Sequence, residues 1–548
     1  MSTANPGQAY HNNLHQRVQL EVDKQDLRKL GWSDGQPLKI QVTTHPEGKA
    51  QACSQLTATT DVAEKEPVFR WEGKTIYYAV TDRFHNGDTS NDQGCNPKDP
   101  QKFHGGDWKG LTAKLDYLEE MKVDALWISC PYLNQRDFFG SDGFHGYWPK
   151  EFDRPEPSFG RSQDLKELID QAHERGIKVI LDVVLNHTSY DHPVKESKPE
   201  WFHHNGNIAG KLQWQMENGS LAGLPDLDQD NPEVKEYLNR VHQDWLGMGF
   251  DGFRLDAVRH VPEPFLRQFN ETMKAQNPDY FSVGEAFWQD ANFVAGYQNR
   301  TTDSMFDFPL AYAIREVFAG DPTRTPEVRQ QLANDLQKLN DQEAERMLRG
   351  GHKSLSMTHL SRIFERDGYY DNPGKLATLI DNHDMVRFMS DTGGDLRKQE
   401  IALAFLYAVR GTPCVYYGTE VAMEGFGVDN RNDMQWDLNP QLREKFVQLV
   451  EVRKSSEALQ FGTQVERLAT EKTYALSRVR ADEEVVVVFN NSDQEQEIEV
   501  PLAHLKEQPE YQEMLSGLKG SLSADGKLAV QLPAKGYAFY QFAPTASL

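Results

Sequence analysis

Side chains suited to acid–base chemistry interrupt apolar stretches of the chain at four places. The segment GFDGFRLDAVRH (249–260) carries Arg254 and Asp256, which alternation places on the same face of an extended strand. Burying ionised groups costs several kcal/mol unless they are paired or used. Comparable clusters end three other apolar segments, DVVLNH (182–187), GEAF (284–287) and DNHD (381–384). One such cluster is ordinarily a helix cap or a satisfied core residue, but four in succession indicate a functional site.

Three carboxylates in a chain without a zinc motif fit the chemistry of glycoside hydrolysis, and the four cysteines show no zinc-binding spacing. In this reaction one carboxylate attacks the anomeric carbon, another protonates the leaving oxygen, and negative charge stabilises an oxocarbenium-like transition state. Arg254 would keep Asp256 ionised and orient it for attack. Glu285 would have to hold a proton near neutral pH, which a desolvated site with other carboxylates favours.

Eight short apolar segments separated by amphipathic helices would position these clusters. They are predicted as strands over residues 75–80, 125–129, 178–184, 249–256, 281–287, 304–308, 376–381 and 412–418. This alternation predicts an α/β fold, a (β/α)8 TIM barrel rather than an open doubly wound sheet, and no glycine-rich dinucleotide motif follows the first strand. Catalytic groups in such a barrel collect at the C-terminal ends of the strands, so the clusters should meet there.

The barrel is predicted over residues 69–455, between two other modules. The connection at about 188–248, after the third strand, is longer than one helix requires and predicts an inserted subdomain. Residues 456–548 contain short strands bounded by Gly, Asn, Asp and Pro, which predicts a C-terminal β-sandwich domain. Residues 1–68 alternate like strands and end in a charged linker, so we expect a small N-terminal β module with a structural role, carbohydrate binding being the alternative.

The composition excludes several classes of partner. The formal net charge is −24 and the pI is about 5.2. An acidic surface repels nucleic acid and anionic membranes and tolerates neutral substrates and divalent cations. No stretch approaches the ~18 apolar residues of a membrane span. We expect a monomer with neither a nucleic-acid partner nor a membrane partner.

The N-terminus leaves two compartments open. The segment MSTANPGQAYHNN lacks a basic region followed by an apolar core, so it is not a signal peptide. We expect a cytoplasmic protein if Met1 is the native start. A secreted or periplasmic protein is the alternative if the chain has been trimmed.

The four clusters resemble the signature regions of the α-amylase family of retaining glycoside hydrolases. They occur in the order and approximate spacing of that family. Further matches are FHGYW (144–148), TDRFHNGD (81–88), FHGGDWKGL (103–111) and GLPDLDQDNPEV (223–234). The resemblance covers roughly 70–548, and the N-terminal segment lies outside it.

The resemblance implies a role for each acidic residue of the clusters. Asp256 would be the nucleophile and Glu285 the general acid/base. Asp384 would be the third carboxylate, which grips ring hydroxyls of the sugar at the cleavage subsite. Arg254 would orient Asp256.

The resemblance also implies a set of substrate contacts. The residues implied to contact the sugar at the cleavage subsite are His145, Tyr147, His187 and His383. Arg259 and His260 would contact glucose units beyond the cleaved bond. Sugars suit aromatic faces because their axial C–H groups pack on the ring. Trp148, Trp214 and Trp288 could provide further platforms, although packing is the simpler interpretation of each.

One or two Ca²⁺ sites follow from the same resemblance. The first would use Asn86, Asp88, Asn91, Asp92, Gly105 and Asp107, and it resembles a site near the first strand of cyclodextrin glucanotransferases and some bacterial α-amylases. Clustered carboxylate and amide oxygens suit a hard cation, whereas the alternative is a polar turn. The second would lie between the barrel and the inserted subdomain and use Asn186, Asp226 and the backbone carbonyl of His260.

Details of the motifs favour one activity within the family. All three carboxylates that the resemblance implies, Asp256, Glu285 and Asp384, are present, which disfavours a non-catalytic carbohydrate-binding protein on the same barrel. Cyclodextrin glucanotransferases carry a central Tyr or Phe four residues before the position of Asp226, where this chain has Ala222. The AVRH segment resembles the AxKH pattern of amylases, with Arg259 in place of Lys. We predict endo-acting hydrolysis of α-1,4 bonds in starch and maltooligosaccharides, with cyclomaltodextrinase or cyclodextrin glucanotransferase activity as the alternatives.

Overall fold

The computed structural model describes residues 69–210, 212–319, 355–481, 483–505 and 510–542. The chain divides into two units, Met1–Phe69 and Arg70–Leu548. The predicted N-terminal β module lies outside the described residues, and the described helices and strands all belong to the second unit. Within the described ranges, no helix combines the length and the apolar character needed to cross a membrane.

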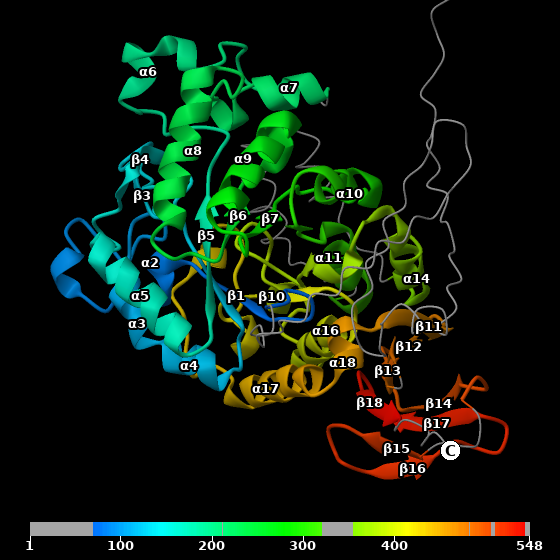
Figure 1. The fold of residues 1–548 in the computed structure, drawn as a ribbon. Coiled ribbons are helices and arrows are strands. Elements are labelled where there is room, and N and C mark those ends of the chain that lie inside the picture. The colour runs from blue at the N-terminus through cyan, green and yellow to red at the C-terminus, as the bar shows by residue number, and fades with distance from the viewer. Residues whose placement is uncertain (1–68, 211, 320–354, 482, 506–509, 543–548) are drawn as a thin grey trace, which may run out of the picture. The chain divides into compact units, whose positions relative to one another are not determined.

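A parallel sheet of eight strands forms the centre of the molecule and closes into a barrel (Figure 1). The strands are β1 (Ile76–Ala79), β2 (Ala125–Ile128), β5 (Lys178–Val183), β6 (Gly252–Leu255), β7 (Phe281–Gly284), β8 (Ser304–Met305), β9 (Ala377–Thr378) and β10 (Thr412–Tyr416). Their order is β8-β7-β6-β5-β2-β1-β10-β9. A parallel bridge between Phe306 and Ala377 joins the two end strands. The predicted TIM barrel is confirmed, with each predicted strand present.

The register of the sheet aligns the ends of the strands that carry the clusters. Val183 pairs with Leu255, and Leu255 pairs with Gly284. Asp256 and Glu285 are therefore the first residues beyond two neighbouring strands, at the same level of the barrel. Because all three strands are buried almost throughout, the polar groups at their ends are held by a rigid apolar frame.

Helices surround the barrel and follow its strands. They are α3 (Trp108–Ala113), α4 (Leu115–Glu120), α5 (Ser162–Glu174), α8 (Pro232–Leu246), α9 (Glu263–Gln276), α10 (Ala291–Arg300), α11 (Phe308–Ile314), α14 (Thr358–Phe364), α16 (Leu396–Ala408) and α17 (Pro440–Lys454). Helices such as α5 and α8 bury one face and expose charged residues on the other. Helix α16 is buried throughout residues 401–408 because it is covered on its outer side too, where Phe405 packs on Phe489 of the C-terminal domain with ring centroids 5.3 Å apart.

Two connections at the C-terminal ends of the strands carry extra structure. An antiparallel pair, β3 (Tyr132–Asn134) and β4 (Pro149–Pro155), follows β2. The long connection after β5 contains the short helices α6 (Val194–Ser197) and α7 (Gln213–Asn218) before α8 begins, and Figure 1 shows both beside the upper end of α8. Bridges from His187 to Asp226 and from Phe202 to Leu227 fold this connection back on itself.

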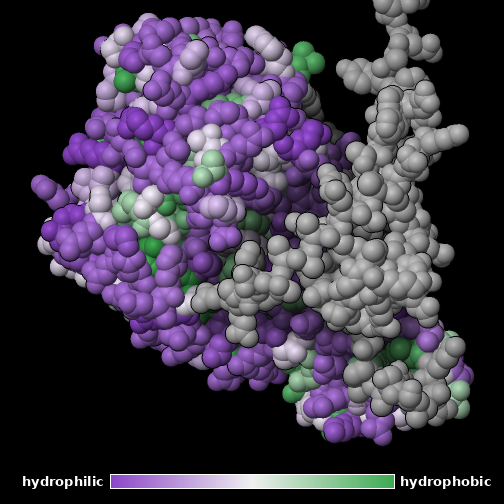
Figure 2. Space-filling view, viewed as in Figure 1, coloured by the Kyte–Doolittle hydropathy of each residue, from purple (hydrophilic) through white to green (hydrophobic). Residues whose placement is uncertain are grey.

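The C-terminal part is all-β, as predicted. A six-stranded sheet consists of β11 (Thr463–Ala469), β12 (Thr473–Arg480), β13 (Glu483–Asn490), β18 (Tyr537–Phe542), β15 (Glu510–Glu513) and β16 (Lys519–Ser521). A second, two-stranded sheet pairs β14 (Gln496–Pro501) with β17 (Lys527–Leu532). Val486 and Val488 of the large sheet share a core with Val500 and Leu528 of the small one. The face of the molecule seen in Figure 2 is mostly hydrophilic, in keeping with the net charge of −24.

Candidate active site

Arg254 is the centre of the candidate site and is 1% exposed. Its Nη1 lies 2.9 Å from Asp182 Oδ1 and 2.7 Å from Asp256 Oδ1, and its Nη2 lies 3.1 Å from Glu285 Oε1. Burial alone would lower the pKa of Arg254, but the surrounding acids outweigh it and raise the pKa above its usual range. One permanent cation therefore holds together three acidic side chains that come from three adjacent strands or their C-terminal ends.

Glu285 lies in a setting that favours its protonated form. The side chain is buried, and Ala257 N–H donates to its Oε2 at 3.0 Å. Burial raises the pKa of Glu285 to about 8, against the opposing effect of Arg254 and with the help of the negative charges of Asp256 and Asp384. A carboxylic acid that keeps its proton at neutral pH can act as a general acid.

Asp384 is the most open of the predicted carboxylates, with 38% of its side chain exposed. Its Oδ2 lies 3.0 Å from His383 Nε2, and its Oδ1 accepts a hydrogen bond from Arg431 Nη2 at 2.7 Å. Desolvation raises the pKa of Asp384, but the interactions with His383 and Arg431 outweigh it and lower the pKa. Asp384 is thus an ionised group that faces the open side of the site.

Arg431 is a site residue that the sequence analysis missed. It ends the 3-10 segment Gly427–Arg431, and its Nε also donates to the backbone carbonyl of His383 at 3.1 Å. Nothing in the local pattern separates this arginine from a solvated one, because it follows no strand directly and belongs to no periodic element.

A chain of hydrogen bonds connects the clusters beneath the carboxylates. Tyr147 Oη donates to Asp182 Oδ2 at 2.7 Å and lies 2.7 Å from His383 Nε2. Burial raises the pKa of Asp182 to about 7 and lowers the pKa of His383 to about 3. The imidazole is therefore neutral, and its Nδ1 is buried without a protein partner. The predicted contacts Tyr147 and His383 thus belong to one network with Arg254.

Two further predicted histidines are arranged around Tyr147. Its backbone N–H donates to His145 Nδ1 at 3.0 Å, and its backbone carbonyl accepts from His187 Nε2 at 3.0 Å. The rings of His145 and Tyr147 are stacked with centroids 5.5 Å apart. Burial lowers the pKa of both histidines, so both are neutral hydrogen-bonding groups.

Arg259 and His260, which are predicted to contact glucose units beyond the cleaved bond, have different partners. The guanidinium of Arg259 lies over the ring of Trp288, 4.6 Å from its centroid. His260 is buried, and its Nδ1 donates to the backbone carbonyl of Met216 in α7 at 3.0 Å. Its imidazole is therefore engaged by the inserted segment. Of the other predicted platforms, Trp214 is 61% exposed.

The first predicted calcium site contains oxygen atoms that the protein leaves without partners. Asn86 donates from Nδ2 to both oxygens of Asp92, at 2.9 and 2.8 Å, and Asn91 donates to Asp107 Oδ2 at 3.2 Å. The Oδ1 atoms of Asn86 and Asn91 are buried with no hydrogen-bond partner. Buried acceptors without donors fit a cation.

Two other predicted ligands of this turn, Gly105 and Asp88, differ in how well they suit a metal site. Gly105 has φ +99°, and an added Cβ would lie 2.5 Å from Asp92 Oδ1, so only glycine lets the backbone approach. Asp88, in contrast, is paired with Lys109 Nζ at 2.6 Å. No group of three His, Cys, Asp or Glu side chains in the described part of the chain could hold a metal ion, so any site here needs amide or backbone oxygens in addition to carboxylates.

The second predicted calcium site has a similar pair of orphaned acceptors. The Oδ1 atoms of Asn186 and Asp226 are buried with no hydrogen-bond partner. The other oxygen of Asp226 lies 2.7 Å from His203 Nδ1, a neighbour that the sequence analysis did not anticipate. Burial raises the pKa of Asp226 to about 6, against the effect of His203. These residues also fit an oxygen-coordinated cation.

Comparison with known proteins agrees with this geometry. A family model described as "Alpha amylase, catalytic domain" matches residues 78–471. A beta/alpha-amylase from Paenibacillus polymyxa is 34% identical over 77% of this chain, which spans 34% of that protein. A cyclomaltodextrin glucanotransferase from Geobacillus stearothermophilus is 32% identical over 76% of this chain, which spans 59% of that protein.

Solved structures resemble the chain over nearly its whole length. An α-amylase from Anoxybacillus aligns with a TM-score of 0.77 at 32% identity, covering 88% of this chain and 100% of that one. The α-amylase from Geobacillus thermoleovorans, solved in complex with acarbose, aligns with a TM-score of 0.76 at 32% identity, covering 87% and 99%. The match of sequence, barrel and carboxylate cluster establishes that the chain is an enzyme of the α-amylase family of glycoside hydrolases.

Proposed function

We propose that this enzyme cleaves α-1,4-glucosidic bonds within starch and maltooligosaccharides by hydrolysis, with retention of anomeric configuration. The observation that carries the proposal is the triple contact of Arg254, which holds Asp256 and Glu285 on two nitrogens of one guanidinium. Retaining glycosidases need two acids about 5–5.5 Å apart, one charged and one protonated. Contact of both carboxyl groups with one buried guanidinium, at 2.7 and 3.1 Å, supports such a close spacing.

The first step would consume the proton of Glu285. Asp256 attacks the anomeric carbon and forms an ester with the sugar, while Glu285 gives its proton to the departing glycosidic oxygen. In the second step the ionised Glu285 takes a proton from water, the water oxygen bonds to the anomeric carbon, and the Asp256 carboxylate leaves. Two inversions return the α configuration.

The remaining groups would act on the sugar ring. Asp384, ionised and open, is suited to bind ring hydroxyls, and the bonds from Arg431 and His383 hold it in one orientation. Tyr147 offers an aromatic face over which the sugar can lie, fixed from below by Asp182. These contacts would orient the anomeric carbon toward Asp256.

Hydrolysis is preferred over cyclisation because of the residue at position 222. Cyclodextrin glucanotransferases carry a central Tyr or Phe at the position of Ala222. Here an exposed methyl group lies on a turn with φ 52°, and the Ala222 carbonyl accepts a hydrogen bond from Tyr190 at 2.9 Å. A glucan has no ring there to wrap around. The similarity to curated glucanotransferases keeps transglycosylation as the second candidate.

Products and their anomers test the proposal. Proton NMR of a starch digest should show the α-anomer of new reducing ends first, and chromatography should show linear oligosaccharides of mixed length. Initial appearance of the β-anomer would contradict the double displacement. Cyclic products from starch would favour the glucanotransferase alternative, whereas rapid opening of β-cyclodextrin with little attack on starch would favour a cyclomaltodextrinase.

The pKa of Glu285 predicts the alkaline limit of activity. The acid must be protonated in the free enzyme, and its pKa is raised to about 8, so kcat/KM for maltoheptaose is expected to fall as the pH rises through about 8. Initial rates measured between about pH 5 and 10 check this. A maltosyl fluoride, whose leaving group needs no proton, should lose less activity over the same range. An alkaline limb centred near pH 6 would contradict the raised pKa.

We also propose that the two clusters of orphaned oxygens bind Ca²⁺. Asn86, Asn91, Asp92 and Asp107 would supply oxygens near the first strand, and Asn186 and Asp226 would do so beside the inserted segment. A metal that binds only the folded protein stabilises it. Chelation is therefore expected to lower the Tm by roughly 5 °C or more.

The control for this experiment is reconstitution. Added Ca²⁺ should restore the Tm after chelator removal, and Mg²⁺ at the same concentration should restore less, because Mg²⁺ demands tighter octahedral geometry. An unchanged melting curve together with no calcium in elemental analysis would count against both sites.

A further inference from the structure

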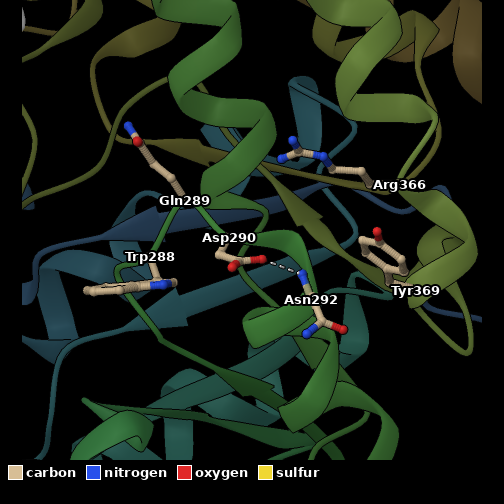
Figure 3. Close-up of a pocket in the computed structure, with 6 residues that line it drawn as sticks. All are labelled: Trp288, Gln289, Asp290, Asn292, Arg366 and Tyr369. Carbon is tan, nitrogen blue, oxygen red and sulfur yellow. Dashed lines mark hydrogen bonds between the residues drawn. The ribbon is translucent and has the colours of Figure 1, made fainter. Parts of the chain in front are cut away.

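The carboxylates Asp256, Glu285 and Asp384 are held to the barrel in two different ways. The N–H groups of Asp256 and Glu285 each donate to the last carbonyl of the preceding strand, at 3.0 Å, so these two residues extend the sheet itself. Beyond Glu285 the chain soon enters α10, which Asp290 caps by accepting from Asn292 N–H at 2.9 Å, beside the open pocket drawn in Figure 3. Backbone pairing therefore fixes Asp256 and Glu285.

Asp384 lies beyond the reach of this pairing. Strand β9 is short, and its pairing with β10 ends at Thr378, several residues before Asp384. Side chains from other segments take over where the strand ends. They donate to the carbonyls of Ile380, Asn382 and His383 at 2.9, 3.1 and 3.1 Å. Asn382 Oδ1 in turn accepts from Asp384 N–H at 2.9 Å, so the main chain that carries Asp384 is held by side chains rather than by the sheet.

Asn430 supplies one of these hydrogen bonds from the loop that follows β10. Its side chain is buried, and its Nδ2 donates to the Asn382 carbonyl at 3.1 Å. Its own carbonyl accepts from Arg387 Nε at 3.0 Å and from Tyr416 Oη at 3.3 Å. Because Tyr416 is the last residue of β10, Asn430 connects that strand to the loop of Asp384.

The segment that carries Asn430 is folded tightly on itself at Gly425. A Cβ on Gly425 would lie 2.4 Å from the Asp429 carbonyl oxygen and 2.9 Å from Asn430 Cα, so only glycine fits there. The Gly425 N–H donates to Ser390 Oγ at 2.9 Å, and its carbonyl accepts from Arg387 N–H at 3.1 Å. The loops after β9 and β10 are therefore joined at several points, which sets the position of Asn430 in the absence of substrate.

Arg315 holds the same loop from the segment that follows β8. It is buried and begins the π-helical turn Arg315–Ala319, directly after α11. Its Nη1 donates to the Ile380 carbonyl at 2.9 Å, and its Nη2 pairs with Asp391 at the end of α15 (Phe388–Asp391). Turns of π-helix are uncommon and recur at functional sites. Arg315 thus fixes the start of the loop, and Asn430 fixes its middle.

We propose that Asn430 and Arg315 are positioning residues for Asp384, because they fix the main chain that carries it where the sheet no longer does. Both side chains are buried, so they act through Asp384 and not on the sugar. The inference rests on the proposed function, in which Asp384 binds ring hydroxyls, and adds to it the residues that set the orientation of this carboxylate. A displacement of about 1 Å in a group that binds the transition state can cost roughly 10²-fold in rate.

The test compares α-maltosyl fluoride with an analogue that lacks the 2-hydroxyl on the reacting ring. Bonds to this hydroxyl strengthen in the transition state, so a misplaced Asp384 should penalise the parent substrate more than the analogue. For Asn430→Ala, kcat/KM is expected to fall about tenfold on the parent and less than about twofold on the analogue. Asp384→Asn calibrates the comparison and should show the same discrimination with a larger loss. A smaller folded fraction would instead lower both values by the same factor.

A double variant tests whether Asn430 acts through Asp384. Once Asp384→Asn has removed the carboxylate, adding Asn430→Ala is expected to lower kcat/KM on the parent by less than about twofold, because residues that share one interaction do not contribute additively. The full loss in both backgrounds would overturn the inference. Arg315→Lys keeps the charge beside Asp391 but not the fork that also reaches the Ile380 carbonyl, and it should lower the parent-to-analogue ratio about fivefold.

Asp429→Ala is the matched control, because Asp429 is an exposed residue of the same 3-10 segment as Asn430, and wild-type values on both substrates are expected. Equal losses on the two substrates, or no loss, in Asn430→Ala and Arg315→Lys would overturn the inference, while hydrolysis of α-glucans by the wild type would still support the proposed function. A wild type inert on α-glucans and on the fluoride would instead refute the proposed function. If one variant fails to fold, as judged by its melting curve, the other decides.

Discussion

An Asp256→Asn variant is expected to lose about 10⁴-fold or more in kcat on soluble starch while remaining folded. The amide has nearly the same size as the carboxylate but cannot form the ester with the anomeric carbon. Arg254 keeps Asp182 and Glu285 as partners in this variant, so the buried cation is not left unpaired. Rates by reducing-sugar release, together with melting curves, check both parts of the expectation.

The Glu285→Gln variant should lose a similar factor in kcat on soluble starch, for a different reason. The amide cannot protonate the leaving oxygen, but it resembles a carboxylic acid that already holds its proton, since the pKa of Glu285 is raised to about 8. The Tm of this variant should therefore stay close to that of the wild type at pH 7. Its first step should recover on a maltosyl fluoride, whereas Asp256→Asn should not recover.

Asp230→Asn is the matched control for these two substitutions. It makes the same carboxylate-to-amide change at a side chain that is 88% exposed and lies outside the site. Full activity is expected. Retention of more than about 1% of wild-type kcat by Asp256→Asn, with wild-type contamination excluded, would remove Asp256 from the role of nucleophile.

Arg254→Met is expected to abolish activity and to lower the free energy of unfolding by about 3–5 kcal/mol at neutral pH. The substitution leaves Asp182, Asp256 and Glu285 close together in a buried site without their cation. Burying uncompensated charge is costly, and the pKa of the buried acids must rise further so that they can neutralise. Methionine fills much of the volume, so the cost is electrostatic rather than a cavity.

The sign of the pH dependence distinguishes this explanation from a packing defect. When burial raises the pKa of an acid in the folded protein, the acid contributes most to the free energy of unfolding at pH values below its pKa in the unfolded chain. That contribution is lost as the pH rises through the pKa of the folded state. Asp182 already has a pKa of about 7 with Arg254 present. The deficit of the variant should thus be small near pH 5 and large near pH 8, as measured by urea unfolding.

Two controls accompany this experiment. Arg254→Lys keeps the charge but not the fork that reaches two acids, so it should recover stability better than activity. Arg240→Met removes an exposed arginine that pairs with Asp244 at 3.6 Å and lies 5.5 Å from the ring centroid of Tyr237, and it should change the free energy of unfolding by less than about 1 kcal/mol. A deficit of equal size at pH 5 and pH 8 would show that packing, and not charge, is responsible.

Much of the barrel could be predicted because its strands are buried on both faces. Segments such as 178–184 and 281–287 are mostly apolar, and the structure places β5 and β7 within them. The pair β3 and β4 was not predicted, because β4 lacks this continuous burial. Strand β4 contains Pro149 and Pro155 and is only partly buried, so neither its composition nor its alternation marks it as a strand.

The acids of the candidate site were also evident from the chain alone, since a carboxylate directly after a buried strand is conspicuous. Their partners were not. Arg431 contacts Asp384 across 47 positions, and His203 contacts Asp226 from an irregular loop. The local sequence pattern indicates which side chains are buried and whether they recur with the period of a helix or of a strand. Which charges become neighbours depends on how the barrel closes and where its loops return, and these are properties of the folded chain.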